Sequence, residues 1–292
     1  MQAEALKGII AYPVTPFLPD GSDLDEAAFR AVIAALLASE PAAIAILGSA
    51  GESAYLRDEE WQRGVEIGVE AVAGAVPLIV GIGELTTAAA VAKARFAEVA
   101  GADMLMVIPV SYWKLTDAEI VEHFAAIASA TALPIMVYNN PATSGVDMNP
   151  ALLVRLVREF ATVRLVKESS GDINRMHAIR ELSEGTIPFY NGANHLALEA
   201  LAAGASGWCT AAPNLLGGEP GRLVDLMAAG DLEEARTLFY AMLPLLRFIV
   251  QGGLPTTVKA GLRLKGLEAG DPRKPLLPLS GEPLEQLRRL IG

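Results

Sequence analysis

The segment LIVGIGELTTAAAVAKARFAEVAGADMLMVI, residues 78–108, decides the fold, because it contains a strand, a helix and a second strand in succession. The runs at residues 78–82 and 104–108 are short and apolar, which is typical of strands buried on both faces of a sheet. Residues 87–100 carry apolar side chains at helical spacing, and Thr86 precedes them as an expected N-cap. A strand–helix–strand unit of this length predicts a parallel sheet.

The same unit recurs from residue 8 to about residue 208. The other expected strands are 8–11, 43–47, 135–138, 163–167, 187–190 and 205–208. The other expected helices in this part are 25–38, 58–73, 117–130, 150–160, 172–181 and 194–203. Eight such units predict a closed (β/α)8 TIM barrel, which typically takes about 250 residues. An open doubly wound sheet is the alternative, but its first turn should be rich in glycine, whereas YPVTPF (12–17) has none.

The pattern changes after about residue 220. No further strand is expected there, and four helical stretches follow, at residues 223–229, 232–250, 256–265 and 283–290. We therefore expect a barrel over residues 1–225 and a C-terminal helical extension over residues 226–292, packed on the barrel.

Composition excludes several classes of protein. Of the 292 residues, 52% are hydrophobic, which excludes a disordered chain. The net charge of −11 disfavours nucleic acids and anionic membranes as partners. Residues 1–10 do not resemble a signal peptide, and a single cysteine excludes an intrachain disulfide. We expect a cytoplasmic protein.

Two polar side chains end neighbouring strands, where barrel enzymes carry their chemistry. Lys167 ends the run VRLV, and burial there would favour the neutral amine that a nucleophilic lysine needs. The alternative is a lysine just beyond the strand that pairs with Glu168. Tyr138 ends IMVY in the preceding strand, and a phenol beside a lysine can relay protons. Its alternative is a tyrosine packed at the barrel rim.

The turn LGSAGES (47–53) follows the second expected strand. Gly48 and Gly51 flank Ser49 and Ala50, so a tight turn can expose backbone N–H groups that bind a carboxylate. The Ser49 hydroxyl could add a donor or pass a proton. An ordinary turn would have the same sequence pattern.

The histidines and the cysteine do not predict a site. His123, His177 and His195 lie in helical patterns at spacings that match no metal motif, so no metal site is expected. Cys209 follows the eighth expected strand without an obvious histidine partner, which favours a buried structural thiol.

Four segments, in this order, resemble the dihydrodipicolinate synthase/N-acetylneuraminate lyase family of Schiff-base aldolases. They are YPVTPF (12–17), GSAGE (48–52), YNNPATSG (138–145) and VKESSG (166–171), and the resemblance runs from about residue 7 to residue 266. It implies a (β/α)8 barrel with C-terminal helices, usually in tetramers. It also implies that Lys167 forms a Schiff base with pyruvate or another 2-oxo acid, that Tyr138 relays protons, and that Ser49 and the Ala50 backbone bind the carboxylate. No metal or diffusible cofactor is needed.

Three departures from the family pattern bear on the substrate. Dihydrodipicolinate synthases carry an arginine that holds the carboxylate of the aldehyde, and this chain has Thr143 there, which removes a bidentate donor. Ala50 replaces the second hydroxyl residue of the turn. In PVSYW (109–113), either Ser111 or Tyr112 takes the place of the tyrosine lent to a neighbouring subunit.

The sequence thus predicts a carbon–carbon or carbon–oxygen lyase of the lysine Schiff-base class: an aldolase, dehydratase or deaminase acting on pyruvate or a deoxy-keto sugar acid. The expected catalytic residues are Lys167, Tyr138 and Ser49, and the expected substrate-binding residues are Gly48, Ala50, Gly51, Thr143 and Tyr112. The alternatives are dihydrodipicolinate synthase itself, a catalytically silent keto-acid-binding barrel, and a metal-dependent aldolase. We expect a homotetramer or homodimer.

Overall fold

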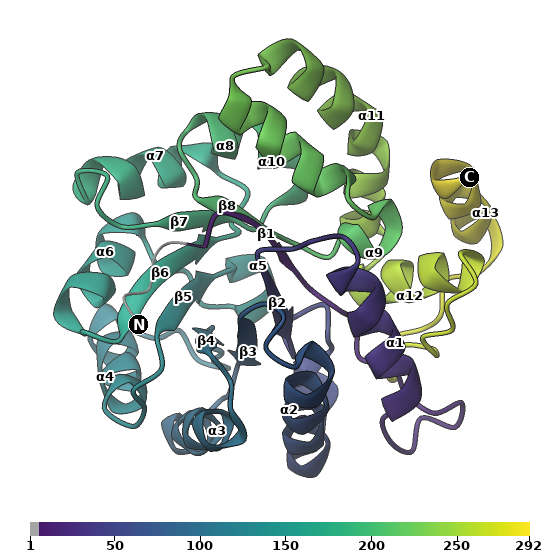
Figure 1. Cartoon of the computed structure of the whole chain (residues 1–292). Helices are drawn as coiled ribbons and strands as arrows, with labels where there is room; N and C mark the ends of the chain where they lie inside the picture. Colours follow the sequence, from purple (N-terminus) through teal and green to yellow (C-terminus); the bar gives the residue numbers. More distant parts are fainter. Residues whose placement is uncertain (1–5) are drawn as a thin grey trace.

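The computed structural model describes residues 6–292 and shows a closed barrel of eight parallel strands in sequence order (Figure 1). The strands are β1 (Gly8–Ala11), β2 (Ala43–Ile46), β3 (Leu78–Ile82), β4 (Met104–Val107), β5 (Ile135–Asn139), β6 (Val163–Glu168), β7 (Phe189–Asn191) and β8 (Gly207–Thr210). Pairing of β8 with β1 closes the barrel. The predicted TIM barrel is confirmed, and the open sheet is excluded.

Helices surround the strands. They are α1 (Glu26–Leu37), α2 (Asp58–Val72), α3 (Thr87–Ala100), α4 (Asp117–Ala128), α6 (Pro150–Glu159), α7 (Ile173–Leu182), α8 (Ala197–Ala202) and α10 (Glu219–Ala229). Several begin at a side chain that accepts a hydrogen bond from a backbone N–H of the first turn, and Thr86 caps α3 in the predicted way.

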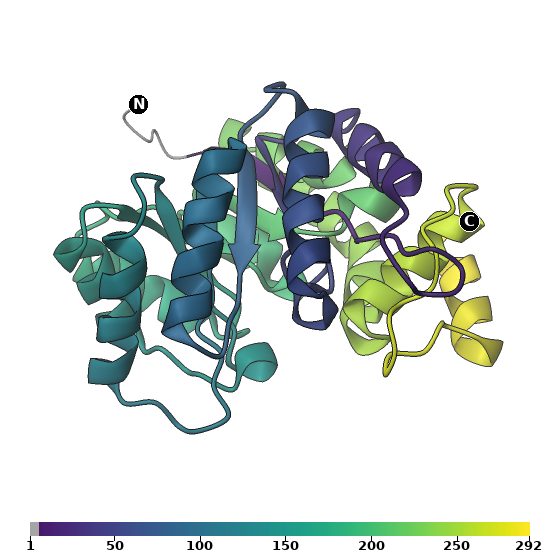
Figure 2. The ribbon, with the colours of Figure 1, turned by 90° about the horizontal axis from the view of Figure 1, so that it is seen from below.

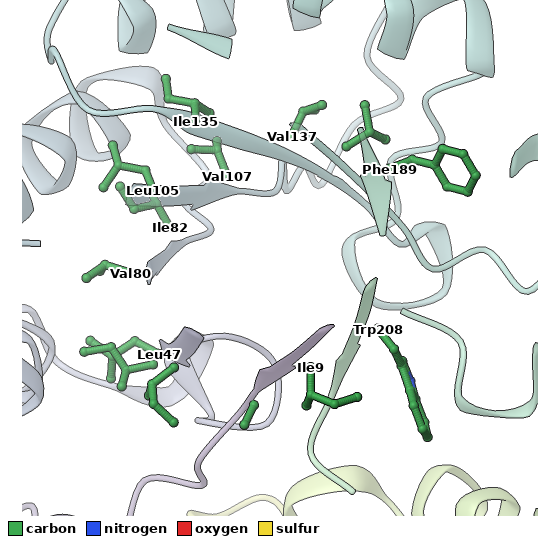
Figure 3. Close-up of a cluster of buried hydrophobic side chains, with 14 of the residues drawn as sticks. Ile9, Leu47, Val80, Ile82, Leu105, Val107, Ile135, Val137, Phe189 and Trp208 are labelled. Atoms are coloured by element: carbon green, nitrogen blue, oxygen red, sulfur yellow. The ribbon is translucent and has the colours of Figure 1, made fainter. Parts of the chain in front are cut away.

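The strand side chains alternate between two buried layers. The outward-facing set packs between the strands and the helices, as Figure 3 shows for Ile9, Val80, Val107, Phe189 and Trp208. The inward-facing set fills the barrel and includes Ile10, Tyr12, Met106, Tyr138 and Cys209. Because both faces are buried, the strands read as continuous apolar runs in the sequence.

The structure corrects the boundaries of some predicted elements. The eighth strand was expected at residues 205–208 and lies at Gly207–Thr210, so Cys209 is inside the strand rather than after it. The seventh, expected at 187–190, is Phe189–Asn191, and the helix expected at 194–203 begins as a 3-10 turn, η2 (Asn194–Leu196). The sequence also missed η1 (Ser53–Tyr55), α5 (Pro141–Ser144) and α9 (Pro213–Leu216), which are too short to show helical periodicity.

Three further helices follow the barrel: α11 (Leu232–Gln251), α12 (Leu254–Leu264) and α13 (Gly281–Ile291). Their apolar side chains, including Leu245, Phe248 and Val258, belong to the same buried cluster as the inward-facing strand residues. In Figure 2 the yellow C-terminal helices lie beside the purple N-terminal segment that follows β1. We retain the division near residue 225 as a proposal; this residue lies within α10. No helix in residues 6–292 is long and apolar enough to span a membrane.

Candidate active site

Lys167 lies within β6 and points into the barrel, where its side chain is almost wholly buried. Its residue is 5% exposed, and Tyr138 is its direct partner in the register between β5 and β6. The Lys167 Nζ atom lies 3.8 Å from the ring centroid of Tyr138 and 4.2 Å from that of Tyr12. Two aromatic faces therefore border the amine, and such faces stabilise a cation that burial has desolvated.

The alternative pairing of Lys167 with Glu168 does not form. Adjacent residues of a strand point to opposite faces, and Glu168 faces outward. Its carboxylate accepts hydrogen bonds from Asn139 Nδ2 at 2.9 Å and from the Ser170 backbone N–H at 2.6 Å. Within residues 6–292, Lys167 forms no ion pair; its recorded polar contact is with Met106 Sδ at 3.7 Å. The amine is thus not held by a carboxylate.

The hydroxyl of Tyr138 sits in a polar environment. It accepts a hydrogen bond of 2.8 Å from Asn140 Nδ2. Burial alone would raise the pKa of Tyr138, but the charge of Lys167 and the side chains of Asn140 and Ser49 outweigh burial and hold this pKa below its usual value. Tyr138 therefore releases its proton more readily than a free phenol does.

Tyr12 faces the same amine but differs chemically. Its hydroxyl donates a hydrogen bond to Met106 Sδ at 3.0 Å. Burial, assisted by the neighbouring Cys209 and Tyr138, raises the pKa of Tyr12 well above its usual range. Environments that push the pKa values of two like groups apart indicate their separate roles, so Tyr138 suits proton transfer and Tyr12 remains a neutral phenol.

The turn after β2 borders these residues. A Cβ atom added at Gly48 would lie 3.1 Å from Met106 Cε and 3.4 Å from the Tyr12 ring. The backbone N–H groups of Gly51, Glu52 and Ser53 donate hydrogen bonds within the turn, and Thr15 Oγ1 donates to the Gly51 carbonyl at 2.7 Å.

Two backbone donors in this turn stay free. The N–H groups of Ser49 and Ala50 donate to no acceptor among residues 6–292. The Ser49 hydroxyl is close enough to Tyr138 to help lower its pKa. Free N–H groups next to a hydroxyl can bind a carboxylate, and here they lie beside the amine.

Thr143 and Tyr112 are both exposed; the Thr143 N–H donates to the carbonyl of Asn140, whose side chain contacts the Tyr138 hydroxyl. Thr143 is exposed on α5, and the end of that helix at Gly145 lies near the Ser111 carbonyl. Tyr112 is 88% exposed and stacks edge-on against the exposed Trp113. The structure therefore does not bring Tyr112 to Lys167 within one chain.

Several residues around the amine were not predicted from the sequence. Tyr12 lies in YPVTPF (12–17), where the pattern indicates no role for it, and Met106 lies in an apolar strand run. Gly192 leaves the space beside the lysine open, because a Cβ there would lie 1.8 Å from Ser169 Oγ and 2.9 Å from Lys167 Cε. The two-residue periodicity of the strands could have placed Tyr12 and Met106 inside the barrel.

The buried position of Cys209 agrees with its interpretation as a structural thiol. Cys209 is a buried free thiol, and burial raises its pKa even though Lys167 and Tyr12 oppose this. No group of three or more histidine, cysteine, aspartate or glutamate side chains in residues 6–292 could hold a metal ion.

Comparisons with known proteins agree with this geometry. Residues 5–292 match the model of the Dihydrodipicolinate synthetase family. The chain is 34% identical, over 97% of its length and 96% of the relative's, to 4-hydroxy-tetrahydrodipicolinate synthase 1 of Halalkalibacterium halodurans. It is 32% identical to the 4-hydroxy-tetrahydrodipicolinate synthase of Methanopyrus kandleri, with 97% and 95% covered.

Solved structures show the same relationship. A Pseudomonas aeruginosa protein inferred to be a dihydrodipicolinate synthetase superposes with a TM-score of 0.96 at 53% identity, over 98% of each chain. The dihydrodipicolinate synthase of Agrobacterium tumefaciens superposes with a TM-score of 0.91 at 33% identity, over 98% of this chain and 97% of its own. The chain belongs to the dihydrodipicolinate synthetase family and is a lyase of the lysine Schiff-base class.

Proposed function

We propose that Lys167 is the nucleophile that condenses with the ketone of a 2-oxo acid such as pyruvate. The observation that carries the proposal is the position of Lys167 Nζ, which is buried, free of any carboxylate and 3.8 Å from the ring centre of Tyr138. In this proposal Tyr138 is the general acid and base. Ser49 and the Gly48–Gly51 turn bind the carboxylate of the 2-oxo acid through the free N–H groups.

The chemistry follows from this placement. The amine nitrogen bonds to the carbonyl carbon and gives up one proton; the carbonyl oxygen takes up that proton and one more from solvent and leaves as water, so a cationic C=N bond forms. In this proposal Tyr138 relays these protons, accepting one from nitrogen and passing it to oxygen. The cation then withdraws electrons from the neighbouring carbon, where a C–H or C–C bond breaks and leaves its electron pair in an enamine. In a dehydration, the enamine's electron pair then expels a hydroxyl group from the next carbon, which leaves as water. The proton released by a C–H bond returns to Tyr138.

Two substrate classes are candidates. The names of the relatives favour 4-hydroxy-tetrahydrodipicolinate synthase activity, in which pyruvate condenses with aspartate semialdehyde. Thr143 favours a substrate without a second carboxylate, such as a deoxy-keto sugar acid, because no guanidinium stands at this position to bind one. A barrel that binds 2-oxo acids without turnover is the third possibility, and the family membership argues against it.

We also propose that the enzyme is a homotetramer or homodimer in the cytoplasm. The family resemblance and the exposed aromatic pair Tyr112 and Trp113 support this assembly. The negative net charge supports a small-molecule substrate rather than nucleic acid or a membrane surface.

The test is to trap the C=N bond with borohydride. The protein is incubated with pyruvate and the reductant, and the added mass is located by peptide sequencing. An adduct on Lys167 that Lys167→Ala abolishes is the expected result. Turnover is then compared between pyruvate with aspartate semialdehyde and a panel of deoxy-keto sugar acids. No adduct with pyruvate or longer 2-oxo acids would overturn the proposal.

A further inference from the structure

A buried ion pair joins the carboxylate-binding turn to the C-terminal helices. Glu52 ends the turn, and its Oε1 lies 2.7 Å from Nζ of Lys259 on α12. Glu52 is 2% exposed and Lys259 is 1% exposed. Removing two charges from water is costly, and well-packed apolar residues would often stabilise a protein as well or better, so stability alone is a weak reason for this pair.

Further contacts hold both partners in place. The second oxygen of Glu52, Oε2, accepts a hydrogen bond of 2.7 Å from the backbone N–H of Arg273. Lys259 also donates to the Asp271 carbonyl at 3.1 Å, and its ammonium lies 4.2 Å from the centre of the Phe17 ring. Residues of the C-terminal extension therefore contact both oxygens of Glu52, Oε1 through the ion pair with Lys259 and Oε2 through the hydrogen bond from Arg273.

The backbone of the turn links the position of Glu52 to that of the free N–H groups of Ser49 and Ala50. Glu52 adopts a left-handed conformation with φ of 55°, and its N–H donates to the Ser49 carbonyl at 3.3 Å. Only Ala50 and Gly51 separate Glu52 from Ser49. A shift of the Glu52 side chain would therefore move the peptide groups of Ser49 and Ala50, which carry the free N–H groups.

We propose that Lys259 is a positioning residue, which sets the affinity of the site for the carboxylate of the 2-oxo acid by holding Glu52 and thereby the N–H groups of Ser49 and Ala50. This inference rests on the proposed function and deepens it. The C-terminal extension then contributes to binding of the 2-oxo acid, in addition to packing against the barrel.

The test uses the half-saturating pyruvate concentration in borohydride trapping. Lys259→Met should raise this concentration about tenfold or more, which corresponds to at least ~1.4 kcal/mol, while the trapping rate at saturation changes less than about threefold. Lys259→Arg should restore most of the affinity, because it keeps the charge. Arg289→Gln, which breaks the exposed pair with Glu282 in the same extension, is the matched control and should change neither value.

A double variant separates positioning from stability. Lys259→Met with Glu52→Gln removes both buried charges, so the melting temperature should return towards that of the unmodified protein while the half-saturating concentration stays raised. Recovery of both quantities, or an unchanged affinity in Lys259→Met, would overturn the inference.

Amide hydrogen exchange gives an answer that needs no turnover. Lys259→Met should accelerate amide exchange in residues 48–53 relative to α13. Equal exchange of residues 48–53 in Lys259→Met and in the unmodified protein would contradict the inference. The unmodified protein decides the proposed function separately: absence of any adduct there would reject the role of Lys167, and the exchange measurement would still test the link from Lys259 to the turn.

Discussion

Tyr138 and Lys167 face each other across two neighbouring strands as register partners, and the Lys167 Nζ atom lies 3.8 Å from the tyrosine ring centre. Register in a buried sheet is strongly specified, because a slip by one residue would turn every side chain of the strand to the other face. The barrel core therefore fixes the spacing of these two side chains. A shift in register would place Glu168 inside the barrel in place of Lys167.

Removing the Tyr138 hydroxyl tests the proton relay. Tyr138→Phe keeps the ring against Lys167 but removes the proposed proton relay, so the reducible adduct with pyruvate should still form, although more slowly. Exchange of the pyruvate methyl hydrogens with solvent, followed by NMR, should slow by about 10²–10⁴-fold, the usual contribution of general acid–base catalysis. Tyr55→Phe, at a partly exposed tyrosine, serves as the control. An undiminished exchange rate in Tyr138→Phe would assign the proton transfer elsewhere.

The pH dependence of the same exchange tests the role of Asn140. The charge of Lys167 and the side chain of Asn140 keep the pKa of Tyr138 below its usual value against the effect of burial. Without the Asn140 amide this pKa moves upward. If phenolate is the base, the rise of rate with pH should shift to higher pH in Asn140→Leu. A profile that coincides with that of the unmodified protein would contradict this assignment.

Gly192 is expected to tolerate no side chain. In Gly192→Ala the added Cβ would collide with Ser169 Oγ and press on Lys167 Cε. We expect the adduct with pyruvate to fall by at least about tenfold, since a misplaced nucleophile loses its attack geometry. Gly218→Ala adds a methyl group where nothing lies within 4 Å and should leave trapping unchanged. Equal trapping in the two variants would show that the space beside the lysine is not needed.

Thr143 can be examined by restoring the arginine of the family pattern. Thr143→Arg should not by itself create synthase activity, because Thr143 is exposed on a four-residue helix that does not fix a long side chain. The measurement is condensation of pyruvate with aspartate semialdehyde by both proteins. Efficient condensation by the unmodified protein would instead overturn the substrate argument from Thr143.

The pair between Arg273 and Glu60 should contribute to stability in a pH-dependent way. Arg273 Nη2 donates to Glu60 Oε1 at 2.7 Å, and the Glu60 side chain is 2% exposed. Leaving a buried charge without a partner typically costs about 3–5 kcal/mol; because Arg57 still contacts Glu60 at 2.9 Å, Arg273→Met should lower the free energy of unfolding at pH 7 by less than this.

Lowering the pH should reduce the difference in free energy of unfolding between Arg273→Met and the unmodified protein. Burial opposes ionisation of Glu60, but Arg273 and Arg57 hold its pKa below the usual value. A lowered folded-state pKa contributes stability above the unfolded pKa and loses it as pH falls through the folded pKa. Urea unfolding should show a smaller difference in free energy of unfolding between the two proteins near pH 3 than at pH 7. An equal difference at both pH values would contradict this linkage.

The sequence predicted the strands to within about two residues at most ends, because burial on both faces leaves a clear apolar run. It also placed Lys167 and Tyr138 on neighbouring strands. It did not place Cys209 inside the barrel, since the small residues of β8 give a weak strand signal. Nor could it find the contact of Glu52 with Lys259, because local periodicity contains no information on which distant charges will meet.

The distance along the chain between Glu52 and its partners has a consequence for synthesis. The N–H of Arg273 reaches Glu52 across 221 residues. A chain growing on the ribosome completes the turn early, but Glu52 receives these partners only after Lys259 and Arg273 have been synthesised. A product truncated before α12 would leave the Glu52 carboxylate without either partner. If Lys259 positions the turn as we propose, the 2-oxo acid site reaches its final form only after α12 and the segment that follows it have folded onto the barrel.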